Sequence, residues 1–152
     1  MGVADQGLVV RRGNPLGLAG VEDLATKRPR LVPRQPGSGA EALLDSLIER
    51  VGIAREALNV GRTALTEADA AMVVADGGAD CGLAVGAAAR RFGLDFVPLH
   101  RERFDIAVRR RAYFEPPLQR LFAFARTHTF SQCADALGFY DVRETGTVAF
   151  NA

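Results

Sequence analysis

The sequence predicts an α/β fold in which helices flank a mostly parallel sheet. Short apolar segments typical of strands alternate with helical segments, as expected when a helix carries the chain from one parallel strand to the next. Alanine and glycine are abundant, tryptophan is absent and phenylalanine supplies most of the aromatic content. This composition favours helices packed closely on a sheet over an aromatic β-sandwich.

Length and charge limit the classes of function. The 152 residues are enough for one domain with a core or for two small lobes. A formal net charge of +1 is too balanced for a protein that binds nucleic acid through a broad basic surface. The N-terminus lacks the basic and apolar regions of a signal peptide, and no stretch is long enough to span a bilayer. We therefore expect a cytoplasmic chain that contacts neither nucleic acid nor membrane.

The first elements are marked by glycine and proline. Residues 7–12 form the first predicted strand, which Gly13-Asn14-Pro15 ends sharply. A short helical turn at residues 21–25 and a second strand over residues 31–34 follow. An amphipathic helix comes next, with apolar residues at helical spacing over 43–51 and Gly52 placed to end it.

The turn between the second strand and this helix has the chemistry of an anion site. The first N–H groups of the helix have no partner inside it, and the peptide dipoles leave partial positive charge there. Gly37 and Gly39 allow positive φ and close approach, Ser38 adds a hydroxyl and Arg34 adds charge. The turn matches neither a Walker loop nor a dinucleotide fingerprint. The residues alone favour the alternative of a tight turn with Ser38 as N-cap.

The rest of the chain continues the alternation and then changes in character. Thr66, with Asp69 three residues later, predicts the N-cap of another helix. The predicted elements after the first helix are, in order, a weak strand at 58–65, a helix at 67–76, a buried strand at 80–85, an alanine-rich helix ending near Arg91, strands at 94–99 and 104–108, a helix opened by Pro116-Pro117, a short helix at 131–137 and an edge strand at 145–150.

With these elements in place, the sequence resembles the periplasmic-binding-protein-like domain related to periplasmic molybdate-binding proteins, which often follows a helix-turn-helix in bacterial regulators. The order and spacing of the matching segments make the resemblance specific. The segments are Arg12-Gly13-Asn14-Pro15 with residues 20–25 (GVEDLA), residues 34–39 with Leu43-Leu44-Asp45, and residues 75–83 (ADGGADCGL), 93–99 (GLDFVPL), 102–106 (ERFDI) and 138–146 (GFYDVRETG).

The resemblance implies the type II periplasmic-binding-protein-like fold, two α/β lobes joined by crossover strands, with the second lobe complete and the first partial. Residues 14–98 would form the ligand-binding lobe, and residues 1–13 and 99–152 the crossover strands and part of the other lobe. The implied ligand is a tetrahedral oxyanion such as molybdate or tungstate, with no cofactor. The expected function is oxyanion binding or sensing, in a transcriptional regulator or a transport-related protein, without catalysis.

The resemblance and the turn chemistry together place a set of residues at the anion. Thr66 would face the same cleft as the glycine turn, and the turn around Val85 would close it. The predicted site residues are Arg34, Gly37, Ser38, Gly39, Ala40, Thr66 and Val85.

Two departures from the family pattern favour an alternative function. Ala40-Glu41 stand where the family has Thr-Arg, and Glu67 stands where a histidine follows the threonine. A module of the same fold that has lost its ligand and serves interaction or oligomerisation would explain both. The chain also begins at what resembles the crossover strand, so either it is a fragment of a longer regulator or its apolar faces pair with a second copy. We expect a homodimer or higher oligomer.

The histidines and cysteines are interpreted as structural residues without a role in metal binding or catalysis. His100 and His128 have no companion at metal-ligand spacing and are expected at the surface, so we predict no metal site. Cys81 and Cys133 lie in apolar settings far apart in the sequence, and we expect both to be small core residues.

Overall fold

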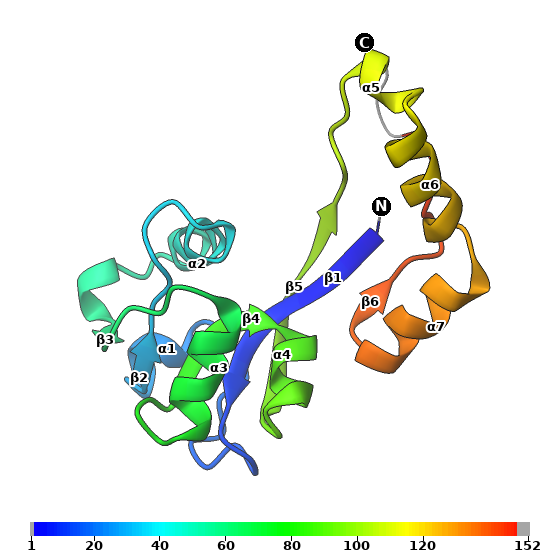
Figure 1. Ribbon diagram of the computed structural model, residues 1–152. Helices are drawn as coiled ribbons and strands as arrows, with labels where there is room; N and C mark the ends of the chain where they lie inside the picture. Colours follow the sequence, from blue (N-terminus) through cyan, green and yellow to red (C-terminus); the bar gives the residue numbers. More distant parts are fainter. Residues whose placement is uncertain (1, 149–152) are drawn as a thin grey trace. The chain divides into compact units, whose positions relative to one another are not determined.

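The computed structural model describes residues 2–148, which form two units (Figure 1). The larger unit comprises residues 5–100, and the smaller unit comprises residues 2–4 with residues 101–148. The boundaries fall within two strands, β1 (Gly2–Val10) and β5 (Asp95–Phe104). Strands and helices alternate through the larger unit, which confirms the predicted α/β class.

The sheet of the larger unit is mixed. Strand β2 (Arg30–Val32) runs parallel to β3 (Asn59–Val60) and to β4 (Cys81–Val85). Strand β1 is antiparallel to β4, with Leu8 opposite Leu83, so the strand order is β3-β2-β4-β1-β5. The parallel pairs β2–β3 and β2–β4 agree with the predicted alternation of strands and helices. The antiparallel strand β1 comes before this alternation in the sequence.

Helices cover both faces of this sheet because alternate strand residues point to opposite sides. The helical elements of this unit are α1 (Asp23–Thr26), α2 (Gly39–Arg50), the short 3₁₀ helix η1 (Arg55–Ala57), α3 (Glu67–Ala75) and α4 (Gly86–Arg91). Leu8, Leu31 and Leu83 pack in a leucine-rich cluster with α1 and α2, whereas Val9 and Val32 pack in an alanine-rich cluster with α3 and α4. Small alanine side chains allow α3 and α4 to lie close to the sheet.

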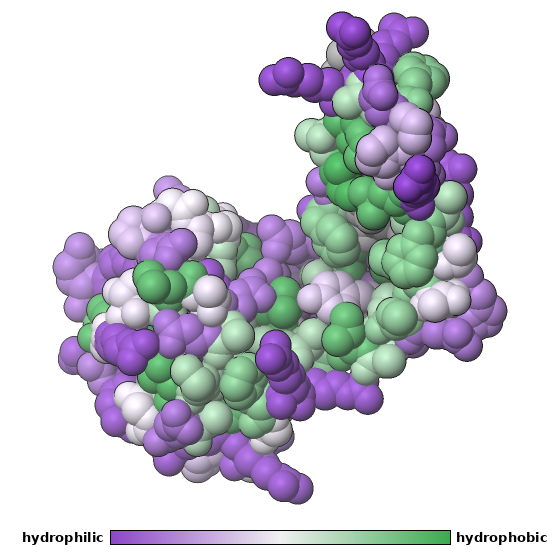
Figure 2. Space-filling model, viewed as in Figure 1, coloured by the Kyte–Doolittle hydropathy of each residue, from purple (hydrophilic) through white to green (hydrophobic). Residues whose placement is uncertain are grey.

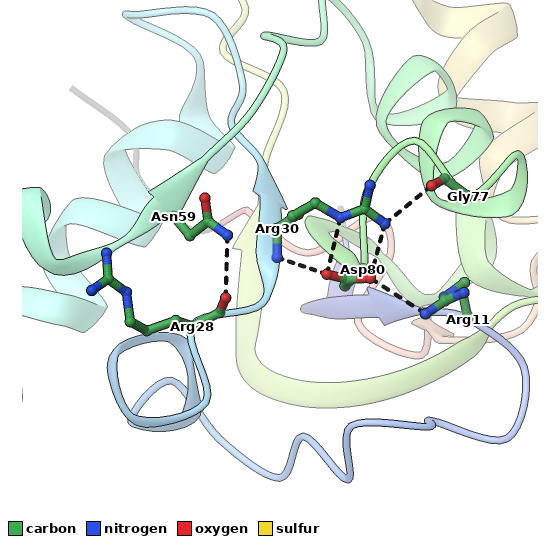
Figure 3. Close-up of polar contacts among 6 residues, drawn as sticks. All are labelled: Arg11, Arg28, Arg30, Asn59, Gly77 and Asp80. Carbon is green, nitrogen blue, oxygen red and sulfur yellow. Dashed lines mark hydrogen bonds and ion pairs between the residues drawn. The ribbon is translucent and has the colours of Figure 1, made fainter.

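Asp80 ties together three strands at one end of the sheet (Figure 3). Its carboxylate accepts the Arg30 backbone N–H at 2.8 Å and makes ion pairs with Arg30 at 3.2 Å and Arg11 at 3.3 Å. The hydrogen bond from the Arg30 side chain is the main cause that holds the pKa of Asp80 below its ordinary value of 3.8. The cluster lies where β2 and β4 begin, so it is at the opposite end of these strands from the predicted anion site.

The smaller unit contains the helices α5 (Arg110–Tyr113), α6 (Pro116–Ala125) and α7 (His128–Leu137), with β6 (Tyr140–Asp141) paired antiparallel to the start of β1. Apart from glycine, the buried residues among the described part of this unit are Ala4, Ala125 and Ala134. Phe114 is 70% exposed and Leu137 is 57% exposed, and apolar side chains lie at the surface over α6 and α7 (Figure 2). This unit therefore buries no large apolar side chain fully among its described residues.

Three predictions in the later part of the chain are wrong. Of the strand predicted at residues 104–108, only Phe104 lies in a strand, as the last residue of β5, and residues 105–108 form none, because alternation specifies a strand only where a neighbour pairs with it. Residues 145–148 form turns and loop instead of an edge strand, while 149 and 150 lie outside the described residues. Cys133 is exposed, because α7 buries the adjacent Ala134, whereas Cys81 is buried as predicted.

Candidate functional site

The predicted anion-binding residues lie in the larger unit, where β2 and β4 end and the next helices begin. The carboxyl ends of parallel strands are where open α/β sheets commonly place ligands. Arg34 follows β2 and forms an isolated parallel bridge with Ala64, so the chain is paired up to the first residue of the turn. Thr66 precedes α3, and Val85 ends β4.

The glycine turn starts α2 in the way that its sequence predicts. Gly37 has a φ of +81°, which glycine adopts without strain. Ser38 is the N-cap, and its hydroxyl oxygen accepts the Glu41 N–H at 3.2 Å. Among residues 2–148, the N–H groups of Gly39 and Ala40 donate to no acceptor. The turn is thus a capped helix start with two free backbone donors.

The side chain of Arg34 has two N–H groups without a hydrogen-bond acceptor in the described chain. Its Nη2 donates to the Leu65 carbonyl at 3.2 Å, just before α3 begins. Its Nε and Nη1 are withdrawn from solvent and have no acceptor in the described chain. A buried polar group without a partner costs roughly 1–3 kcal/mol, so this guanidinium would be stabilised by an additional acceptor. The contact with Leu65 brings Arg34 beside Thr66.

Glu41 turns back toward the strand and the next loop. It is 7% exposed, its carboxylate accepts the Arg34 backbone N–H at 2.9 Å, and it pairs with Arg55. The negative charge of Glu41, which stands where the family has arginine, is therefore neutralised by the ion pair with Arg55. Glu41 fixes the backbone of Arg34 and does not carry an unpaired charge.

Glu67 lies at the start of α3 and bridges two strands. Its carboxylate accepts the Val85 N–H at 3.4 Å and the Gln6 side-chain amide at 3.4 Å. The N–H of Val85, which is one of the predicted site residues, therefore donates to a side chain of the protein itself. Thr66 caps α3 as predicted, since its hydroxyl oxygen accepts the Asp69 N–H at 3.0 Å.

Sequence reasoning missed the non-local partners of the site. Leu65 contributes only a carbonyl, for which no side-chain signal exists. Gln6 gives a detectable signal, because it is a polar residue of β1 that is only 5% exposed, and buried amides need partners. The contact between Gln6 and Glu67 joins residues 61 positions apart.

Other groups of the described chain offer little chemistry. Burial raises the pKa of the Cys81 thiol to about 12, which keeps it protonated and unreactive at neutral pH. His100 and His128 are exposed, as predicted. In the described part of the chain, no three His, Cys, Asp or Glu side chains are grouped to hold a metal ion. No helix within residues 2–148 has both the length and the apolar character needed to cross a bilayer.

The smaller unit contains a separate cavity of about 500 Å³ that includes none of the predicted site residues. Asp141 lies among its arginines, and hydrogen bonds from Arg143 hold the pKa of this carboxyl far below its usual range. Arg101 lies 3.6 Å from the same carboxylate, so much of the positive charge of the cavity is matched internally. Its lining residues are Gly2, Val3, Arg101, Arg103, Asp141, Arg143 and Glu144.

We compared the sequence with models of protein families and with known proteins. A family model described as a PBP superfamily domain matches residues 3–126. The uncharacterized protein YvgK of Bacillus subtilis (strain 168) is 31% identical over 143 residues, which are 93% of this chain and 46% of that protein. The chain thus spans less than half the length of this relative.

Solved structures share the fold at low sequence identity. L-phospholactate-bound PEB3 of Campylobacter jejuni superposes with a TM-score of 0.68 at 15% identity, covering 93% of this chain and 66% of that one. The effector binding domain of QuiR in complex with shikimate gives a TM-score of 0.59 at 15% identity, covering 81% and 60%. These likenesses confirm the type II fold class.

Proposed function

Because the chain belongs to the PBP superfamily, whose fold is generally a binding fold, we propose that its larger unit binds a small anion through the guanidinium of Arg34. The observation that carries this proposal is the pair of shielded Arg34 N–H groups, Nε and Nη1, which lack an acceptor in the described chain. A carboxylate or a tetrahedral oxyanion would supply one. The role is ligand binding or sensing without catalysis.

Two further features support an anion at this place. The free N–H groups of Gly39 and Ala40 lie at the positive end of α2, a helix of 12 residues. Phospholactate and shikimate, found in PEB3 and QuiR, are both acids that are ionised at neutral pH. The molybdate or tungstate that the sequence resemblance implies belongs to the same class of small anions and is included in the test.

Thermal unfolding with added anions tests the proposal. Wild-type protein is melted with sulfate, molybdate, tungstate, phosphate, L-lactate or shikimate, at constant ionic strength against chloride. Binding at a concentration of ten times Kd adds about 1.4 kcal/mol of stability, or roughly 3–6 °C in Tm for a chain of this size. We expect Arg34→Gln to weaken the binding roughly 10- to 100-fold, since a hydrogen bond to a charged group contributes about 1.5–3 kcal/mol.

Arg62→Gln is the matched control for this substitution. Arg62 pairs at 3.0 Å with Asp69, a residue in the first turn of α3, and its side chain is 70% exposed. This variant removes the same charge near the site and should retain the thermal shift. The proposal fails if no anion shifts the wild type, or if Arg34→Gln responds as the wild type does.

A second candidate function is self-association through the smaller unit, and the exposure of its apolar side chains favours it. A unit that fully buries only small residues gains stability when a second copy covers its phenylalanines and leucines. Light scattering at micromolar concentration should then give at least a dimer mass, and Phe114→Glu with Leu137→Glu should reduce it to a monomer mass. Met72→Glu, at a 46% exposed position of the larger unit, is the control. A monomeric wild type would contradict self-association.

A further inference from the structure

The cavity of the smaller unit gathers arginines from different strands. Its lining residues belong to the start of β1, to the end of β5, and to β6 with the turn that follows it. Strand β1 pairs with both of the other strands, and Val3 lies opposite Asp141 in the pairing with β6. The cavity is therefore built on one small piece of sheet, and all of its lining residues belong to the same unit.

Strand geometry places the arginines of β5 together. Arg101 and Arg103 are alternate residues of β5, so their side chains share a face and both line the cavity. Phe104 points to the opposite face, where its ring meets the edge of the Tyr140 ring with 6.3 Å between the centroids. Arg143, which follows β6, adds a third guanidinium to the lining.

The acidic side chains offset this positive charge only in part. The lining contains three arginines and two carboxylates, those of Asp141 and Glu144. Asp141 accepts hydrogen bonds from Arg143 Nε at 2.9 Å and Nη2 at 2.5 Å, and lies 3.6 Å from Arg101. These bonds hold the Arg143 side chain against the cavity.

The ion pairs of the cavity can be replaced by a ligand of higher charge. Arg103 pairs at 3.1 Å with Asp105, which is outside the lining. The side chains of Arg101, Arg103 and Arg143 are 52–86% exposed. Ion pairs at such exposure contribute little to stability, because water competes for both partners. A multiply charged anion therefore gains more from the three guanidiniums than it loses by opening these pairs.

The size and lining of the cavity indicate the class of this anion. Its volume of about 500 Å³ is that of a small-molecule site. Arg101 and Arg103 start about 6.6 Å apart along β5, and Arg143 comes from the other side chain group, so two or three linked phosphates engage more guanidiniums than one phosphate does. We infer that this cavity binds the diphosphate or triphosphate group of a small molecule through Arg101, Arg103 and Arg143.

The phosphates alone should supply the affinity. The lining, which lies within the described residues, contains no aromatic side chain on which a nucleobase could stack. Free pyrophosphate and a nucleoside diphosphate should therefore bind similarly. This site goes beyond the proposed function, because Arg34 belongs to the larger unit and the cavity to the smaller one.

Calorimetric titration of the whole chain with pyrophosphate, ADP and inorganic phosphate, at constant ionic strength, tests this inference. We expect pyrophosphate and ADP to bind with affinities within about threefold of each other, and both at least about tenfold more tightly than phosphate. Arg103→Gln and Arg143→Gln should each weaken pyrophosphate binding about tenfold or more, since each removes hydrogen bonds between charged groups. Glu144→Gln should strengthen it about two- to fivefold, because one repulsive charge leaves the lining.

Arg120→Gln is the matched control, because Arg120 is an exposed residue of α6 in the same unit and outside the lining. This variant and Arg34→Gln should keep the wild-type affinity for pyrophosphate. Loss of binding in Arg34→Gln, with binding retained in the cavity variants, would assign the ligand to Arg34 and overturn this inference while the proposed function stands. Wild-type protein that does not bind pyrophosphate, that binds ADP alone, or that binds phosphate equally well would overturn it without any variant.

Discussion

Gly7→Ala should lower the free energy of unfolding by about 3 kcal/mol or more, the largest stability change that we expect from a single methyl group in this chain. A Cβ at Gly7 would lie 2.9 Å from the Pro98 Cα and 2.9 Å from the Phe96 ring, and closer still to the Val97 carbonyl oxygen. Overpacking of a core typically costs 1–3 kcal/mol, and more where backbone cannot give way. Such a loss is a large share of a total stability of roughly 5–15 kcal/mol.

Gly82→Ala is the matched control on the neighbouring strand. Its Cβ would lie 3.5 Å from the Val32 Cβ and 3.6 Å from the Ala70 Cβ, which is ordinary contact. Urea unfolding followed by circular dichroism should show a change within about 1 kcal/mol for this variant. Equal stability of the two variants would contradict the close approach of β1 and β5 at Gly7.

Asp80→Asn should lower the free energy of unfolding by about 2 kcal/mol at pH 7, because hydrogen bonds to charged groups contribute about 1.5–3 kcal/mol. The amide keeps the shape of the side chain but loses the ion pairs with Arg30 and Arg11 (Figure 3). Asp76→Asn is the control, because Asp76 is exposed at the end of α3. Urea unfolding of the three proteins measures the difference.

The effect of Asp80 should also depend on pH. The folded state lowers the pKa of this carboxyl from 3.8, chiefly through the Arg30 hydrogen bond. Its stabilisation is therefore complete above the unfolded pKa and is lost as the pH falls through the folded pKa. The difference between wild type and Asp80→Asn should be constant from about pH 8 to pH 5 and shrink below about pH 4. A difference that grows in acid would contradict the ion-pair cluster.

Local features of the site could be predicted from the sequence because their causes lie within a few residues. Ser38 and Thr66 were both expected to cap helices, and each accepts an N–H three residues later. Of the two turn glycines expected to allow positive φ, Gly37 adopts it, whereas Gly39 is the first residue of α2 and does not. The alternation of strands and helices likewise predicted the fold class, since it depends only on apolar spacing along the chain.

Features that depend on distant contacts could not be predicted. Glu67 was identified only as a departure from the family pattern, and its contacts with Gln6 and Val85 arise from the pairing of β1 with β4. Glu41 was identified as a departure from the family, yet only the fold brings Arg55 to it. The strand expected at 104–108 failed for the same reason, because a strand needs a partner that the local sequence does not reveal.

We propose above all that the Arg34 guanidinium binds a small anion. A ¹H–¹⁵N spectrum of the arginine Nε–H groups tests this binding most directly. The Arg34 signal is identified as the one that disappears in Arg34→Gln. Titration with L-lactate, sulfate and an L-amino acid panel should move this signal in a saturable manner, while the Arg62 signal stays in place. An Arg34 signal that does not respond to any of these anions would contradict the claim.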